Sequence, residues 1–77
     1  MKTEIQEYVV NELLSGAEIG EHDDLLLSGL VDSLGVMRLV AHIEQRYGIT
    51  VPPQDLTIEN FATIADIASY VDRSRKT

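Results

Sequence analysis

The sequence lacks cysteine, so neither a disulfide framework nor a thiolate metal site can stabilise its fold. Basic residues are few, and six of them against thirteen acidic ones give a formal net charge of −7. This charge argues against nucleic acid and anionic membranes as partners. The apolar run Leu25–Leu27 is far shorter than the ~20 residues that span a bilayer, and the N-terminal segment has no signal-peptide core. We therefore expect a cytoplasmic protein without membrane insertion.

What is present fits one small globular domain over residues 1–77, with 44% hydrophobic and 25% charged residues. A chain of this length buries only about 60% of its unfolded surface, so its core is thin. The negative charge is distributed unevenly, because residues 1–32 hold eight acids and one base, whereas residues 33–77 hold five of each. All of the excess negative charge therefore precedes Ser33.

The apolar spacing predicts an all-α fold, a small four-helix bundle with three main helices and one short helix. The first helix is expected over about residues 4–15, opened by a Thr3–Gln6 capping box and stopped at Gly16. The second is expected over residues 33–47, with Asp32 as its N-cap and Gly48 as its stop.

After an extended Pro52–Pro53 connection, Thr57 is expected to cap a short turn over residues 58–61. Thr63 is expected to cap the last helix, because Asp66 follows three residues later. The predicted buried face of that helix consists of Ile64, Ala65, Ala68 and Val71.

Residues 16–31 have no clean period and predict a long loop between the first two helices. A loop of this length is uncommon in a compact domain and is often functional. We expect its apolar residues to tuck under the loop and anchor it to the core; they are Leu25, Leu26, Leu27, Leu30 and Val31.

Intrinsic catalysis and metal binding find little support in the sequence. His22 and His42 are twenty residues apart and form no metal-binding motif, and Asp23–Asp24 fits a solvated acidic loop. A hydrolase built on Ser33, Asp32 and His42 would need a pocket and an oxyanion hole. We therefore expect neither an enzyme nor a metal site.

The segment around Ser33 is the most informative part of the chain. A serine at the first turn of a helix, after a long loop, exposes its hydroxyl beside the positive helix end, where a phosphodiester is tolerated well. The simpler alternative is that Asp32 and Ser33 only cap the helix.

The helix that follows Ser33 has apolar residues on two sides. Leu39, Ile43 and Val36 mark the core face, together with Val40 and Tyr47. Leu34, Met37 and Ala41 fall near the opposite side, with Glu44 beside them. An exposed apolar stripe indicates a partner surface; alternatively, Leu34 and Met37 pack under the long loop.

The chain resembles the carrier-protein family, which comprises acyl carrier proteins and the peptidyl carrier proteins of nonribosomal synthetases. The likeness covers nearly the whole sequence. It is carried by Asp32-Ser33-Leu34, the loop ending Ser28-Gly29-Leu30-Val31, the helix through Glu44 and Tyr47, Ile49-Thr50-Val51-Pro52, and TIENFATI at residues 57–64.

The resemblance implies that a phosphopantetheinyl transferase attaches 4′-phosphopantetheine to Ser33, and that the arm carries an acyl or aminoacyl thioester. Asp32 would help the transferase to position its metal and coenzyme A, while Leu34 and Met37, with Ala41 and Glu44, would meet partner enzymes. Those partners would be an acyl- or aminoacyl-activating enzyme and downstream transferases or synthases. We expect a monomer. Because the chain is short and caps lie near both of its ends, we also expect a free-standing carrier, the alternative being an excised module.

The second helix departs from that of fatty-acid-synthase carriers, which present a run of acids to basic patches on their enzymes. Here the matching positions are Gly35, Arg38 and Ala41, and only Glu44 is retained. We therefore expect a role in specialised biosynthesis, of the polyketide or nonribosomal-peptide type. The alternatives are a primary fatty-acid or D-alanyl carrier and, from another class, a helical interaction module without the prosthetic group.

Overall fold

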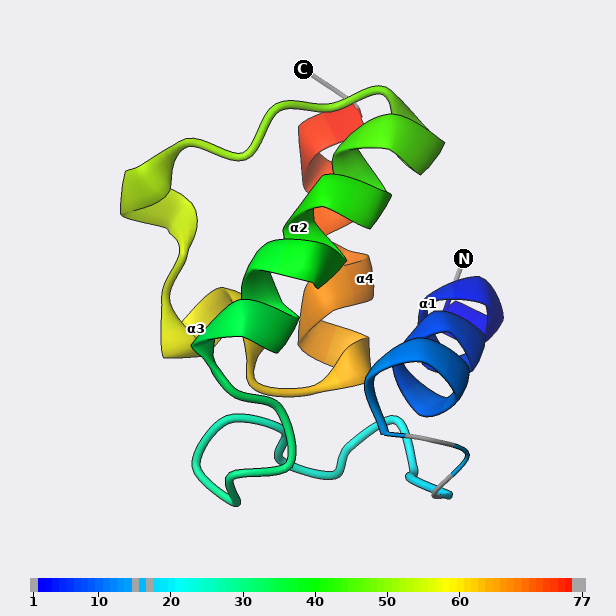
Figure 1. Cartoon of the computed structure of the whole chain (residues 1–77). Coiled ribbons are helices and arrows are strands. Elements are labelled where there is room, and N and C mark those ends of the chain that lie inside the picture. Colours follow the sequence, from blue (N-terminus) through cyan, green and yellow to red (C-terminus); the bar gives the residue numbers. More distant parts are fainter. Residues whose placement is uncertain (1, 15, 17, 76–77) are drawn as a thin grey trace.

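Four α-helices form the structure, a computed structural model that describes residues 2–14, 16 and 18–75 (Figure 1). In chain order they are α1 (Lys2–Tyr8), α2 (Ser33–Tyr47), α3 (Ile58–Phe61) and α4 (Ile64–Arg75). A π-helical segment, Val9–Leu13, continues α1, and a 3-10 turn that the sequence did not predict, Pro53–Asp55, precedes α3. The described residues include no strand, and the all-α bundle with one short helix is confirmed. No helix within these ranges is long and apolar enough to cross a membrane.

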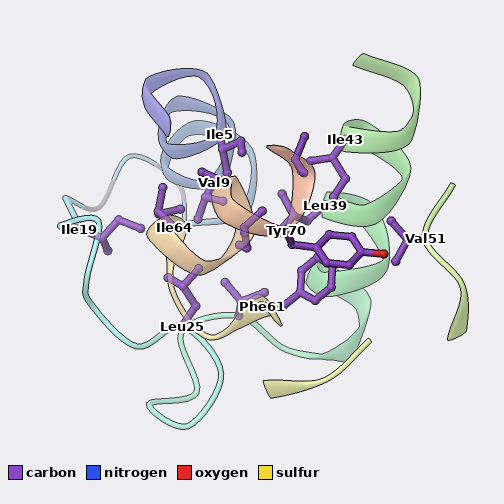
Figure 2. Packing of buried hydrophobic residues seen from close by; sticks show 14 residues of the cluster. Ile5, Val9, Ile19, Leu25, Leu39, Ile43, Val51, Phe61, Ile64 and Tyr70 are labelled. Carbon is purple, nitrogen blue, oxygen red and sulfur yellow. The ribbon is translucent and has the colours of Figure 1, made fainter. Parts of the chain in front are cut away.

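Helix α4 is the central packing element and contacts the other three helices. Figure 2 shows Ile5 and Val9 close to Ile64 of α4, and Phe61 beside Tyr70, with ring centroids 5.4 Å apart. Of the face predicted for α4, Ile64, Ala68 and Val71 are buried and Ala65 is half-buried; Ile67 and Tyr70 also belong to the core.

Helix α2 has the limits that the sequence predicts. Asp32 is its N-cap, and Gly48 ends it in the left-handed conformation (φ +67°) that glycine adopts without steric cost. Leu39 and Ile43 are fully buried, and the other predicted core residues, Val36, Val40 and Tyr47, pack against them half-buried. Figure 1 shows the start of α2 above the long loop and next to α3, and residues of all three segments line one hollow.

The first helix differs from its prediction at both ends. Thr3 lies inside α1, so it does not cap the helix, and Gln6 donates a hydrogen bond from Nε2 to the Ile19 carbonyl in the loop instead. Beyond Tyr8 the helix widens into the π-helical segment, which keeps Val9 buried in the core. The helical segment ends at Leu13 with Leu14 as its C-cap, earlier than the predicted end at residue 15. Gly16 follows with φ +89° and donates from its N–H to Val10 O at 2.7 Å; Ser15 lies outside the described residues.

Three buried residues, Ile19, Leu25 and Val31, anchor the long loop to the core. Leu25 and Val31 are buried, and Val31 N donates to Leu25 O at 2.8 Å, which closes the turn between them. Leu25 N also donates to Ala62 O at 2.6 Å, at the junction of α3 and α4. Burial was wrongly predicted for Leu27 and Leu30, which are 73% and 45% exposed, because the closed turn holds them away from the core.

The two threonines expected as caps behave differently. Thr63 Oγ1 accepts a hydrogen bond from Asp66 N at 3.0 Å, which confirms the predicted cap of α4. Thr57 occupies the N-cap position of α3, but its side chain makes no capping bond; its carbonyl accepts from Asn60 N and Phe61 N instead.

Candidate functional site

Ser33 is the first residue of α2, at an exposed position directly after the long loop. The preceding Asp32 is extended and accepts a 2.8 Å hydrogen bond from Gly35 N at Oδ1. This bond satisfies one of the free N–H groups at the helix start and fixes the backbone that carries Ser33. The Ser33 hydroxyl therefore stands at the positive end of a 15-residue helix and is open to solvent.

The turn that leads to Ser33 is held by polar bonds within the loop. Asp24 Oδ1 accepts from Leu26 N at 3.0 Å and from Leu27 N at 2.6 Å, and Ser28 Oγ donates to Asp24 O. Gly29 then takes φ +79°, a value that a side chain would disfavour. These hydrogen bonds take the place of the regular backbone hydrogen bonds of a helix. The loop therefore has a defined shape, although its tip is exposed.

Gly35 allows the first turn of α2 to lie close against the loop. It is buried, and a Cβ atom at this position would lie 2.8 Å from Cγ1 of Val31. The glycine therefore serves close packing here. The acid that fatty-acid-synthase carriers are expected to have at this position would need Val31 or the helix to shift.

Exposed apolar side chains gather around Ser33. Leu34 and Met37 are 69% and 65% exposed, so neither packs under the long loop, and Ala41 is exposed as well. Sequence reasoning missed Leu30, Leu56 and Ile58, which are also exposed. We call the following set the apolar rim: Leu30, Leu34, Met37, Leu56 and Ile58.

The apolar rim lines two hollows that share Asp32. The larger one, about 570 Å³, has Ser33 at its edge and lies between Met37 of α2 and Leu56 and Ile58 near α3. The smaller one, about 300 Å³, lies on the other side, between the loop and α2, and is lined by Leu30, Leu34 and Arg38 among others. Ser33 thus lines the larger hollow, and its chain neighbours Asp32 and Leu34 line the smaller one.

The charged residues of α2 differ in their surroundings. Glu44 is half-buried, and its Oε2 accepts a hydrogen bond from Val51 N at 2.8 Å, which ties the connection after α2 to the helix. Arg46 pairs with Glu4 of α1, and this hydrogen bond holds the pKa of Glu4 below its usual value. Arg38 is exposed beside the smaller hollow.

The histidines lie apart from Ser33 and from each other. His42 stacks on Tyr8 with ring centroids 3.9 Å apart, and exposed His22 pairs with Glu21 in the loop. Within the described ranges, no three histidine or acidic side chains are close enough together to hold a metal ion.

A family model described as the phosphopantetheine attachment site matches residues 4–71, which is most of the chain. The chain belongs to this carrier family. Its members hold 4′-phosphopantetheine covalently and carry acyl groups on it without catalysing reactions themselves, so this carrier is not an enzyme.

Two curated relatives illustrate the likeness. The acyl carrier protein of Campylobacter hominis is 30% identical over 74 residues, covering 95% of this carrier and 91% of the relative. The D-alanyl carrier protein of Streptococcus suis is 39% identical over 49 residues, covering 64% of this carrier. That match spans 62% of the Streptococcus suis protein, somewhat less than two thirds of its length.

A solved crystal structure, named as that of a FAD-dependent dehydrogenase, contains a chain with the same fold. Its TM-score to this carrier is 0.80 at 33% sequence identity, and the match covers 87% of this carrier and 97% of that chain. The matched chain is therefore about as short as this carrier.

Proposed function

We propose that Ser33 carries the 4′-phosphopantetheine, and that the arm holds an acyl or aminoacyl intermediate of specialised biosynthesis. The observation that carries the proposal is the exposed Ser33 at the first position of α2, inside the range that the family model matches. Backbone N–H groups and the helix dipole favour an anionic phosphodiester at this position. When attached, the arm supplies a thiol that holds the cargo as a thioester.

Attachment is a group transfer from coenzyme A to the Ser33 hydroxyl. A bond forms between Oγ and the phosphorus next to the pantetheine, and the pyrophosphate P–O bond breaks to release adenosine 3′,5′-bisphosphate. The hydroxyl proton passes to a base of the transferase. Asp32 orients Ser33 as the helix cap, and its exposed position leaves the carboxylate accessible to the metal of the transferase.

The exposed residues Leu34, Met37 and Ala41 are proposed to meet the partner enzymes, because an apolar surface next to the attachment site becomes buried when an enzyme docks. Glu44 is proposed to lie at the far end of this contact, where it also holds Val51.

A role in specialised biosynthesis is supported by the charge of α2. Enzymes that dock through a basic patch need acids on the carrier, and Gly35, Arg38 and Ala41 offer none. The relatives named D-alanyl carrier proteins support a second candidate, in which the cargo is D-alanine.

Ser33 is tested by intact mass after incubation with coenzyme A and a broad-specificity phosphopantetheinyl transferase. Wild type and Ser69→Ala, which removes another exposed helical serine, should gain one phosphopantetheinyl group, whereas Ser33→Ala should gain none. An unmodified wild type, under conditions that load a control carrier, would refute the attachment site.

The cargo is tested by offering the loaded protein to a panel of enzymes with their substrates. The panel holds amino-acid- and carboxylate-adenylating enzymes, a D-alanine-activating ligase and a malonyl transacylase of fatty-acid synthesis. Specialised biosynthesis predicts the highest kcat/KM with an adenylating enzyme other than the D-alanine ligase. The highest value with that ligase would establish the second candidate, and the highest with the transacylase would contradict both.

A further inference from the structure

Arg38 differs from the other arginine of α2 in having no acidic partner. It is exposed, and its guanidinium donates only a 3.4 Å hydrogen bond to the backbone carbonyl of Glu12. Among the described residues, no carboxylate forms an ion pair with Arg38, whereas Arg46 is paired with Glu4. The cation therefore stands available at the surface.

Arg38 lies next to apolar side chains that a docking partner would cover. It lies one helical turn after Leu34 and lines the smaller hollow together with Leu30 and Leu34. A partner that covers the apolar rim must therefore approach the guanidinium as well. Covering a cation with apolar surface alone removes its water and supplies no replacement, which is costly.

We infer that the enzyme that loads this carrier docks on the apolar rim and places a carboxylate against Arg38. The inference rests on the proposed carrier function and adds the charge that the loading enzyme presents. A carboxylate offers the planar guanidinium two parallel hydrogen bonds and repays its desolvation. The carrier then supplies the positive charge and the enzyme the negative one, which is the reverse of docking through acids on α2. Arg38 is therefore a specificity-determining residue.

A second copy of the chain is the other occupant that could supply carboxylates, since residues 1–32 hold eight of them. Two copies would each bring a formal charge of −7, however, and would repel one another. The charge balance therefore favours an enzyme as the occupant.

The test uses the phosphopantetheinylated full chain and the panel enzyme with the highest kcat/KM on the wild type. Arg38→Glu should raise KM about tenfold or more with kcat little changed, because two carboxylates then face each other. Arg38→Gln should raise KM less, and added salt should raise the wild-type KM. The matched control is Arg73→Glu on α4, which changes another exposed arginine whose guanidinium donates a 3.4 Å hydrogen bond. Its KM should stay within about twofold of the wild-type value.

Equal KM values for Arg38→Glu and Arg73→Glu, or a lower KM for Arg38→Glu, would overturn the inference. Light scattering that shows a wild-type dimer, dissociated by Arg38→Glu, would overturn it in favour of a second copy. A wild type that takes up phosphopantetheine but is loaded by no panel enzyme would overturn the proposed cargo class and this inference together. A wild type that takes up none would refute the carrier function itself.

Discussion

At the scale of single residues, Asp32 combines two tasks that a substitution can separate. Its carboxylate caps α2 through Gly35 N, and it is proposed to serve the transferase. Asn caps a helix about as well as Asp but has no charge. Asp32→Asn should therefore keep the stability of the wild type but slow phosphopantetheine transfer.

Asp32→Ala should lose about 1 kcal/mol of stability as well, because the capping bond is gone. Urea unfolding measures the stability, and the rate of mass gain with coenzyme A measures the transfer. If Asp32→Asn were modified as fast as the wild type, the carboxylate would have a structural role only.

Gly35 packs closely against Val31, at a position where fatty-acid-synthase carriers are expected to have an acid. Ala at this position gains helix propensity of up to about 1 kcal/mol, but its Cβ would lie 2.8 Å from Val31 Cγ1. Overpacking of this kind typically costs about 1–3 kcal/mol. We therefore expect Gly35→Ala to be destabilising, by about 1 kcal/mol once the propensity gain is subtracted.

The cause is checked by a double-mutant cycle with Val31→Ala, which removes the clashing methyl group. In that background Gly35→Ala should become neutral or stabilising in urea unfolding. An unchanged penalty in both backgrounds would show that Val31 is not the obstacle.

At the scale of elements, Thr57 and Thr63 offer a direct comparison of two caps in one chain. Thr63 Oγ1 accepts from Asp66 N, whereas Thr57 caps α3 with its carbonyl alone. Thr63→Ala should therefore cost about 1 kcal/mol, and Thr57→Ala much less. Thermal and urea unfolding of the two variants measure the difference, and equal losses would contradict the assignment of the caps.

Much of the helix layout could be predicted because local signals set it. Asp32 and Gly48 mark the ends of α2, and the apolar period of that helix matches its buried face. The start of α1 was mispredicted, because the Thr3–Gln6 pattern reads as a cap wherever it occurs. In the structure Gln6 instead bonds to Ile19, thirteen residues later, and a local pattern contains no information on that contact.

The candidate site could be predicted where it lies on α2 and only partly where it lies in loops. Leu34 and Met37 were placed on the exposed face by helical spacing. Leu27 and Leu30 lie in a segment without a regular apolar period, so their burial was predicted from their apolar side chains alone. Their exposure follows from the hydrogen bond between Val31 N and Leu25 O, which closes the turn.

At the scale of the whole molecule, two ion pairs connect α1 to other elements. Glu4 of α1 bonds to Arg46 near the end of α2, and Lys2 pairs with Glu21 of the long loop at 3.0 Å. Each pair lowers the pKa of its carboxyl group below the usual 4.5 through a side-chain hydrogen bond. The stability that they contribute is therefore present above pH 4.5 and is lost as the pH falls through the lowered values.

Tyr47 and Tyr70 set the alkaline limit of the pH range in which the fold is most stable. Burial raises the pKa of Tyr70, and its hydrogen bond to Asp55 raises it further; burial and Glu4 do the same for Tyr47. Folding thus favours the neutral forms of both tyrosines. Their contribution to the free energy of unfolding is present below pH 10 and is lost as the pH rises through the raised pKa values. The wild type should therefore be most stable between these two limits.

The acid limit is the one that a single variant can move. Arg46→Gln removes the main cause of the lowered Glu4 pKa, so the variant should be less stable than the wild type at neutral pH. The two stabilities should converge as the pH falls, because protonated Glu4 no longer attracts Arg46 in the folded wild type. Urea unfolding at a series of pH values measures this convergence. Arg73 bonds to the neutral Asn60, so Arg73→Gln should keep a constant difference in stability from the wild type as the pH falls. The same constancy in Arg46→Gln would exclude Glu4 as the linked group.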